Sequence, residues 1–144
     1  MAKVVLPDEV MLDEVARLLE AGRDVVFVPK GRSMLPFIRG EMDQVVLRKA
    51  EDVSVGDIVL AKIDGRYVLH RVYAIDGKQL TLMGDGNLQG TELGTVDDVA
   101  GKVVEIVTPK GRHHRPGKAW LWRHLLPLRK YLLKCYRKWN KWFK

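Results

Sequence analysis

The chain has 144 residues, of which 47% are hydrophobic and 30% charged, and its formal net charge is +7. This composition supports about one domain with its own core, and the single cysteine, Cys135, excludes an internal disulfide framework and a cysteine-based zinc site. No apolar run approaches the roughly 18 residues of a membrane span, and the first residues do not have the pattern of a secretory signal, so we expect a protein without either segment.

Residues 8–20 are predicted to form a helix. Pro7 precedes the segment, Asp8 and Glu9 suit a helix N-terminus, and Gly22 suits a C-terminal stop. The apolar residues between these ends have helical spacing. One face of the helix is therefore expected to pack on the body of the domain.

Short runs with strand character follow the helix. They are residues 24–28, 44–48, 57–63, 66–75, 79–83 and 101–107. Two junctions are Asp-Gly pairs, Asp64-Gly65 and Asp76-Gly77, and this dipeptide favours the type I′ hairpin turn, which predicts a three-stranded meander over residues 57–83. Strands and helices do not alternate and no repeat is visible. The expected fold class is therefore mostly β, with antiparallel sheets and one N-terminal helix.

The C-terminal quarter differs sharply in charge from the rest. Residues 1–108 hold 13 Lys/Arg and all 18 Asp/Glu, whereas residues 109–144 hold 12 Lys/Arg, no acidic residue and all four Trp. Residues 109–117 (PKGRHHRPG) are predicted to be an exposed basic linker. Apolar residues spaced by three and four then predict an amphipathic helix within residues 118–144. The chain thus divides into a body, a linker and a basic aromatic tail.

Ser33 lies between Gly31 and Pro36, in a segment that follows a predicted strand. The glycine and the proline turn the backbone there, so the serine hydroxyl could face a cleft. A serine hydroxyl becomes an effective nucleophile only with a base within about 3 Å. Without such a base, a serine in a turn merely satisfies backbone groups.

His70 is the residue that could supply this base. It alternates with Val68 and Val72 and therefore shares a strand face with small apolar side chains. A polar ring on such a face needs a hydrogen-bond partner, so His70 is either a satisfied core histidine or a base for Ser33. Asp85 lies in a Gly-Asp-Gly turn that could carry a carboxylate to the imidazole and fix its tautomer. The alternative is an ordinary turn.

Four motifs occur in order along the chain. They are GRSMLP at residues 31–36, VGDIV at 55–59, HRV at 70–72 and GDGN at 84–87. In this order they resemble the type I signal peptidase family and are similar to the self-cleaving peptidase domain of SOS-type repressors. The resemblance runs from about residue 26 to residue 107. It implies a coiled, mostly β peptidase fold of this signal-peptidase and repressor type.

The resemblance also implies roles for individual residues. It assigns Ser33 as the nucleophile. Bacterial signal peptidases use a lysine base, whereas the endoplasmic-reticulum and archaeal branch has histidine, so His70 is implied as general base and later acid. That branch carries an aspartate some residues beyond the fourth motif, where Glu92 is the nearest acid in this chain. We take Asp85 as the group that orients His70, with Glu92 as the alternative.

The resemblance also has implications for substrate binding. By resemblance, Met34 and Leu35 help line the substrate cleft. The chain has no N-terminal membrane span of the signal peptidase type, so its substrate need not be an exported preprotein. Ala21-Gly22 is a dipeptide of the type cleaved in repressor-like relatives. Because Gly22 is already explained as a helix stop, self-cleavage there is not favoured.

The tail is predicted to bind an anionic membrane surface, with Trp and Leu on one helix face and basic residues on others. The residues expected to contact the membrane are Trp120, Trp122, Lys130, Lys134, Trp139 and Trp142. Docking on protein and binding of nucleic acid are alternatives, although the body carries no recognised nucleic-acid motif. His113 and His114 in the linker have no further ligand cluster beside them, so no metal site is expected.

The sequence therefore predicts a serine endopeptidase that cleaves a protein substrate through Ser33, His70 and Asp85. It is expected in the cytoplasm, peripherally associated with a membrane, and without a cofactor or metal. The alternative is a non-catalytic relative of the same fold that binds peptides or membranes.

Overall fold

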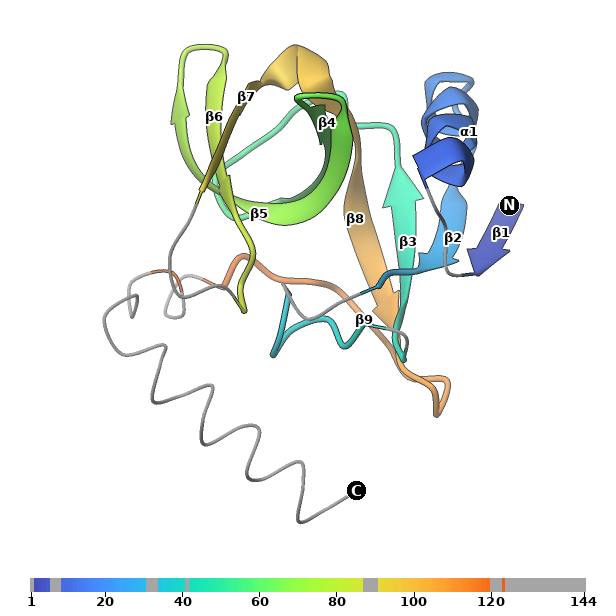
Figure 1. Cartoon of the computed structure of the whole chain (residues 1–144). Coiled ribbons are helices and arrows are strands. Elements are labelled where there is room, and N and C mark those ends of the chain that lie inside the picture. Colours follow the sequence, from blue (N-terminus) through green and yellow to red (C-terminus); the bar gives the residue numbers. More distant parts are fainter. Residues whose placement is uncertain are drawn as a thin grey trace.

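The computed structural model describes residues 2–5, 9–30, 34–40, 42–86, 91–119 and 123. In this part of the chain nine strands form one sheet in the order β1-β2-β3-β8-β4-β5-β6-β7, with β9 added on β8 (Figure 1). The β1–β2 pair is parallel and all other pairs are antiparallel. The elements are β1 (Ala2–Val5), α1 (Glu9–Glu20), β2 (Val25–Val28), β3 (Gln44–Arg48), β4 (Ile58–Ile63), β5 (Arg66–Asp76), β6 (Gln79–Met83), β7 (Glu92–Thr95), the 3-10 helix η1 (Val96–Asp98), β8 (Val99–Val107) and β9 (His113–His114). The mostly β, antiparallel fold class with a short N-terminal helix is confirmed.

Helix α1 ends where the sequence predicts. Gly22 has a φ of 84°, and its N–H donates to the carbonyl of Leu19 at 2.9 Å. The N–H of Arg23 donates to the carbonyl of Leu18 at 3.0 Å. These two hydrogen bonds around a left-handed glycine make a Schellman motif, which satisfies the last carbonyls of the helix. Gly22 is therefore a helix stop, as expected.

Two apolar cores hold the sheet together. The larger one lies between α1, β2, β3, β4 and β8 and includes Val15 and Leu19 of the helix, both fully buried. The smaller one lies inside the curled second half of the sheet and is centred on Val59, Val72 and Leu82. The helix thus covers one end of the sheet, while β4 to β7 enclose a core of their own (Figure 1).

The predicted meander is present as β4, β5 and β6. Asp64 and Gly65 have φ values of 52° and 79°, which fits the predicted type I′ turn. The second turn differs, because Asp76 is the last residue of β5 and the central residues are Gly77 and Lys78. Of these two only Gly77 has a positive φ, whereas a type I′ turn needs both, so that prediction was wrong.

Strand β5 curls strongly and changes its partner along its length (Figure 1). Residues 66–71 pair with β4, and residues 71–76 pair with β6, with a register shift between Val72 and Ala74. Among the described residues, the first half of β5 therefore pairs on one side only. His70 lies at the end of this half.

Three short strands were not predicted: β1, β7 and β9. Strand β7 follows the GDGN segment and pairs with β6, which places Glu92 opposite Leu82. Glu92, which the sequence analysis places in a connecting segment, thus belongs to a strand beside the meander.

The linker at residues 109–117 returns to the body. Its β9 pairs with β8, and at its end the carbonyl of Gly117 accepts a hydrogen bond from Arg71 at 2.9 Å. Next to it, the ammonium of Lys118 lies 3.5 Å from the carboxylate of Asp57. The chain leaving the linker is therefore fixed to the domain at the level of β5.

This attachment can be tested at Gly56. Its φ is 97°, and a Cβ placed there would lie 2.5 Å from Cβ of Lys118. Gly111 has a similar φ of 83° but open space around it. Both alanine variants are strained by the positive φ, and only in Gly56→Ala does the added methyl group also overlap Lys118. We therefore expect Gly56→Ala to lower the free energy of unfolding by about 1–3 kcal/mol more than Gly111→Ala. Urea unfolding measures the difference. Equal losses in the two variants would contradict the packing of Lys118 on Gly56.

Of the tail at residues 118–144, the structure describes Lys118, Ala119 and Arg123. The predicted tail helix is otherwise outside the described part of the chain. The same holds for the predicted membrane-binding residues Trp120, Trp122, Lys130, Lys134, Trp139 and Trp142. No helix among the described residues is long and apolar enough to cross a membrane.

Candidate active site

His70 is buried on β5, with 8% of its surface exposed, and its partner is Glu92. The Nδ1 atom of the imidazole contacts Oε1 of Glu92 in a short hydrogen bond. Strand β7 makes this contact possible, since its pairing with β6 carries Glu92 across to β5. A carboxylate on Nδ1 accepts the N–H from that nitrogen and leaves the lone pair on Nε2. The ring is therefore held in the tautomer that can accept a proton at Nε2.

Asp85 does not make the hydrogen bond to His70 that the sequence analysis assigned to it. Its carboxylate binds the guanidinium of Arg71 through both oxygens, with 2.9 Å from Nε to Oδ1 and 2.7 Å from Nη2 to Oδ2. Both side chains are fully buried. The carboxylate that contacts His70 belongs instead to Glu92, the alternative residue. The expectation for Asp85 is corrected because β5 sends Arg71, the neighbour of His70, toward the Gly-Asp-Gly turn.

Burial raises the pKa of the Asp85 carboxyl above its ordinary value, while the hydrogen bonds and charge of Arg71 act in the opposite direction. The remaining donors of Arg71 are also used. Nη1 donates to the carbonyls of Gly56, at 2.8 Å, and Gly117, at 2.9 Å. The guanidinium lies 5.1 Å from the ring centre of Phe37. Arg71 thus joins β5, the turn after β6 and the end of the linker into one buried unit behind His70.

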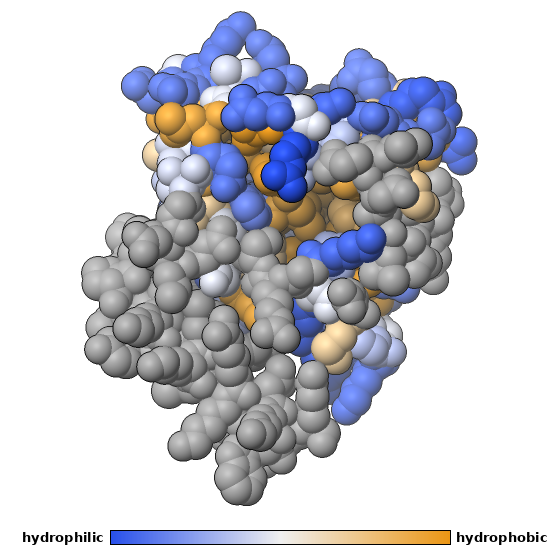
Figure 2. Space-filling model, viewed as in Figure 1, coloured by the Kyte–Doolittle hydropathy of each residue, from blue (hydrophilic) through white to orange (hydrophobic). Residues whose placement is uncertain are grey.

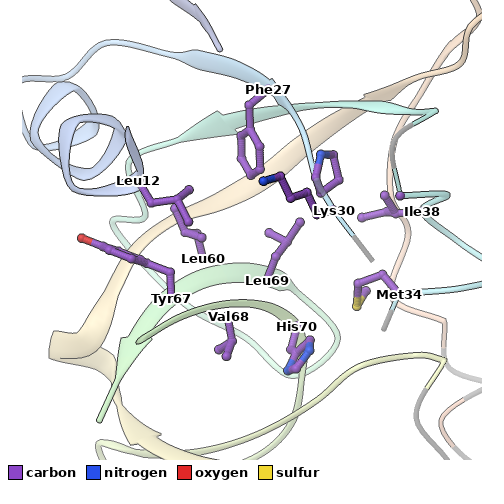
Figure 3. A pocket seen from close by; sticks show the side chains of 12 residues that line it. Leu12, Phe27, Lys30, Met34, Ile38, Leu60, Tyr67, Val68, Leu69 and His70 are labelled. Atoms are coloured by element: carbon purple, nitrogen blue, oxygen red, sulfur yellow. The ribbon is translucent and has the colours of Figure 1, made fainter. Parts of the chain in front are cut away.

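A pocket of about 230 Å³ opens between α1, β2, the segment at residues 34–40 and β5, and His70 borders it (Figure 3). Met34 lines this pocket together with residues from each of these elements. Leu35, the other residue expected in the cleft, is not part of its lining. Viewed as in Figure 1, the surface shows apolar side chains in a central hollow with hydrophilic residues above it (Figure 2).

Ser33 lies outside the described residues, as do Gly31 and Arg32. The two residues that flank this segment, Lys30 and Met34, both line the pocket that His70 borders. Both ends of the serine segment are therefore attached to the wall of the same pocket.

A metal centre finds no support in the described part of the chain, where no group of three or more His, Cys, Asp or Glu side chains could hold an ion. In the linker, His113 instead contacts Glu105 of β8.

The comparison with protein families agrees with the fold. A family model described as Peptidase S24-like matches residues 4–104, more than half of the chain, and the chain belongs to this family. The match confirms the resemblance to the signal peptidases and the SOS-type repressor peptidases that the four motifs indicated. It also supports a peptidase-like function in general terms. No curated protein matches the chain significantly.

Proposed function

We propose that this protein is a serine endopeptidase in which Ser33 is the nucleophile, His70 the general base and Glu92 the residue that orients the imidazole. The observation that carries the proposal is the contact of Glu92 with Nδ1 of His70 at the border of the pocket. A buried histidine that served only the core would not need to lie beside a cleft. A carboxylate on one ring nitrogen and a cleft beside the ring is the arrangement that a base requires.

The reaction follows from these roles. Nε2 of His70 takes the proton of the Ser33 hydroxyl as its oxygen attacks the scissile carbonyl. The tetrahedral intermediate collapses to an acyl-enzyme when His70 returns the proton to the leaving amine. Water, deprotonated by His70, then attacks the ester and releases the acyl product and Ser33. Glu92 stabilises the imidazolium that forms in both halves of the reaction.

The sheet supports a peptide as substrate. Residues 66–70 of β5 pair with β4 on one side, and the described residues leave the other side unpaired. An extended peptide can add to such an edge through main-chain hydrogen bonds. His70 at the end of this edge would then face a backbone carbonyl of the added segment.

The test is cleavage of a complex mixture of peptides by the full-length chain, with products read by mass spectrometry. We expect Ser33→Ala and His70→Ala to abolish cleavage, while Ser54→Ala, which changes an exposed serine on the same domain, leaves the cleavage pattern intact. Products that persist with Ser33→Ala would exclude this serine as the nucleophile. Peptide binding without cleavage by the unaltered chain would favour a non-catalytic relative.

We further propose that the tail holds the enzyme at an anionic membrane surface. Residues 118–144 contain nine Lys/Arg, four Trp and no acidic residue, a composition suited to lipid headgroups. The carbonyl of Gly117, the last linker residue before the tail, accepts a hydrogen bond from Arg71, the chain neighbour of His70. A tail bound to a membrane would thus keep the site close to that surface.

This proposal predicts that deleting residues 120–144 abolishes sedimentation with vesicles containing phosphatidylserine. Lys130→Gln together with Lys134→Gln should weaken binding by about 2 kcal/mol, because each basic residue near the surface contributes about 1 kcal/mol. Lys78→Gln on the body should have no effect. Undiminished binding after the deletion, or stronger binding to single-stranded DNA than to vesicles, would overturn the membrane proposal.

A further inference from the structure

The pocket beside His70 extends from β5 to helix α1. It runs from His70 and Met34 at one end to Leu12 of α1 and Tyr67 of β5 at the other (Figure 3). Its described lining is mostly apolar and includes no carboxylate, and its one ammonium belongs to Lys30. Among the described residues, Lys30 has no ion-pair partner. Such a lining favours an apolar occupant and disfavours a cationic one.

The volume of the pocket also limits which substrate side chains can fill it. An engineered apolar cavity of about 150 Å³ is large enough to bind benzene. The pocket here measures about 230 Å³, so it accommodates the side chain of leucine, methionine or phenylalanine. The methyl group of alanine would leave most of this space unfilled and would bury little apolar area.

The pleat of β5 shows how a substrate side chain would reach the pocket. Leu69 extends from one side of the strand and Val68 and His70 extend from the other (Figure 3), and all three border the pocket. A peptide added to this edge would alternate in the same way, so its successive side chains would lie in turn on the side of Leu69 and on the side of His70. With a rise of about 3.3 Å per residue, the occupant lies within about three residues of the scissile bond.

Resting on the proposed peptidase function, we propose that this pocket selects a bulky apolar residue within three positions of the cleaved bond, and that Leu12 sets its depth. Lys30 acts against substrates that present lysine or arginine there. Helix α1 is thereby a specificity element, since it contributes Leu12 to the far wall.

Two leucines of α1 provide a matched test. Leu12 and Leu18 are both partly buried and both pack on the larger core, but only Leu12 lines the pocket. The probes are internally quenched peptides built on one sequence that the full-length chain cleaves. Each position within three residues of the scissile bond is occupied in turn by Ala, Leu, Phe or Lys, and kcat/KM is measured for each peptide.

At one position we expect Leu or Phe to exceed Ala by roughly tenfold to a hundredfold, and Lys to be the poorest. Leu12→Ala should raise the Phe-to-Leu ratio by about tenfold, since one methylene in such a pocket changes kcat/KM by at least that factor. Leu12→Trp should reverse the preference toward Ala. Leu18→Ala should leave all ratios unchanged.

The outcomes separate the pocket from the peptidase activity. A preference for Ala at every position, or equal ratios in Leu12→Ala and Leu18→Ala, overturns the pocket proposal while leaving the peptidase intact. If no peptide is cleaved, fluorescence anisotropy measures binding of the Ala, Leu, Phe and Lys peptides to the same variants. Binding with the expected preference and its loss in Leu12→Trp then supports the pocket alone, and binding without preference overturns it.

Discussion

Replacing Asp85 with leucine is expected to lower the free energy of unfolding by about 3–5 kcal/mol, the usual cost of leaving one member of a buried ion pair alone. The guanidinium of Arg71 is fully buried, so bulk solvent cannot reach it to replace the lost carboxylate. Its other hydrogen bonds, to the carbonyls of Gly56 and Gly117, cannot neutralise the charge. Chemical unfolding of the full-length protein in urea measures this loss.

The ion pair between Arg71 and Asp85 should itself stabilise the fold by much less than about 3–5 kcal/mol. The pKa of Asp85 is raised because the cost of burying its charge exceeds the stabilisation of that charge by Arg71. We therefore expect the double variant Arg71→Met with Asp85→Leu to recover at least half of the stability lost in Asp85→Leu. No recovery would show that the pair contributes through its geometry rather than through charge neutralisation.

A pair of the same chemistry on the surface is the control. Asp24 and Arg48 are also joined by two hydrogen bonds, at 3.2 and 3.0 Å, but the arginine side chain is 60% exposed. The hydrogen bonds from Arg48 lower the pKa of Asp24, in contrast to Asp85. Asp24→Leu is expected to cost less than about 1 kcal/mol. A loss as large as that in Asp85→Leu would contradict the role given to burial.

Local signals explain why much of the fold follows from the sequence. The Asp-Gly turns, Gly22 and the alternation along β5 each act over a few residues, and they predicted the meander, the helix stop and the strand that carries His70. The family motifs added the general architecture. The type of the second turn was missed, because the pairing of Asp76 with Gln79 in the sheet decides which residues form the turn.

The strands that were missed depend on partners far away in the chain. Strand β1 is held by β2, and the two residues of β9 are held by β8. Segments this short carry too little periodicity to be recognised alone. The same reason hid β7, and with it the position of Glu92 beside His70.

The error at Asp85 has a traceable origin. The alternation along β5 separates His70 from Arg71, but the sequence analysis does not consider Arg71 as a partner of Asp85. Uninterrupted counting back from the second turn places His70 opposite Asp85, but a register shift between Val72 and Ala74 moves Arg71 opposite Met83, two residues before Asp85. A carboxylate at that point is closer to the arginine than to the histidine. The register shift in β5, which the sequence does not reveal, therefore separates Asp85 from His70.

Glu92→Gln is expected to reduce kcat by about 10²–10⁴-fold, because an uncharged amide neither stabilises the imidazolium nor fixes the tautomer. If the amide donates to Nδ1, the proton moves to Nε2, and the ring can no longer accept the hydroxyl proton of Ser33. The value of KM should change little, since Glu92 acts on the imidazole and not on the substrate. Steady-state kinetics on a peptide cleaved by the unaltered chain gives both quantities.

The matched control for this prediction is Glu105→Gln, which alters the second Glu–His contact of the domain, between Glu105 and the exposed His113. It should leave kcat unchanged. The ¹⁵N chemical shifts of the imidazole of His70 report independently which nitrogen carries the proton, and we expect them to move in Glu92→Gln but not in Glu105→Gln. Undiminished kcat together with unmoved shifts in Glu92→Gln would mean that another group orients His70, and Asp85, whose pKa already responds to the charge of His70, would then be the next residue to test.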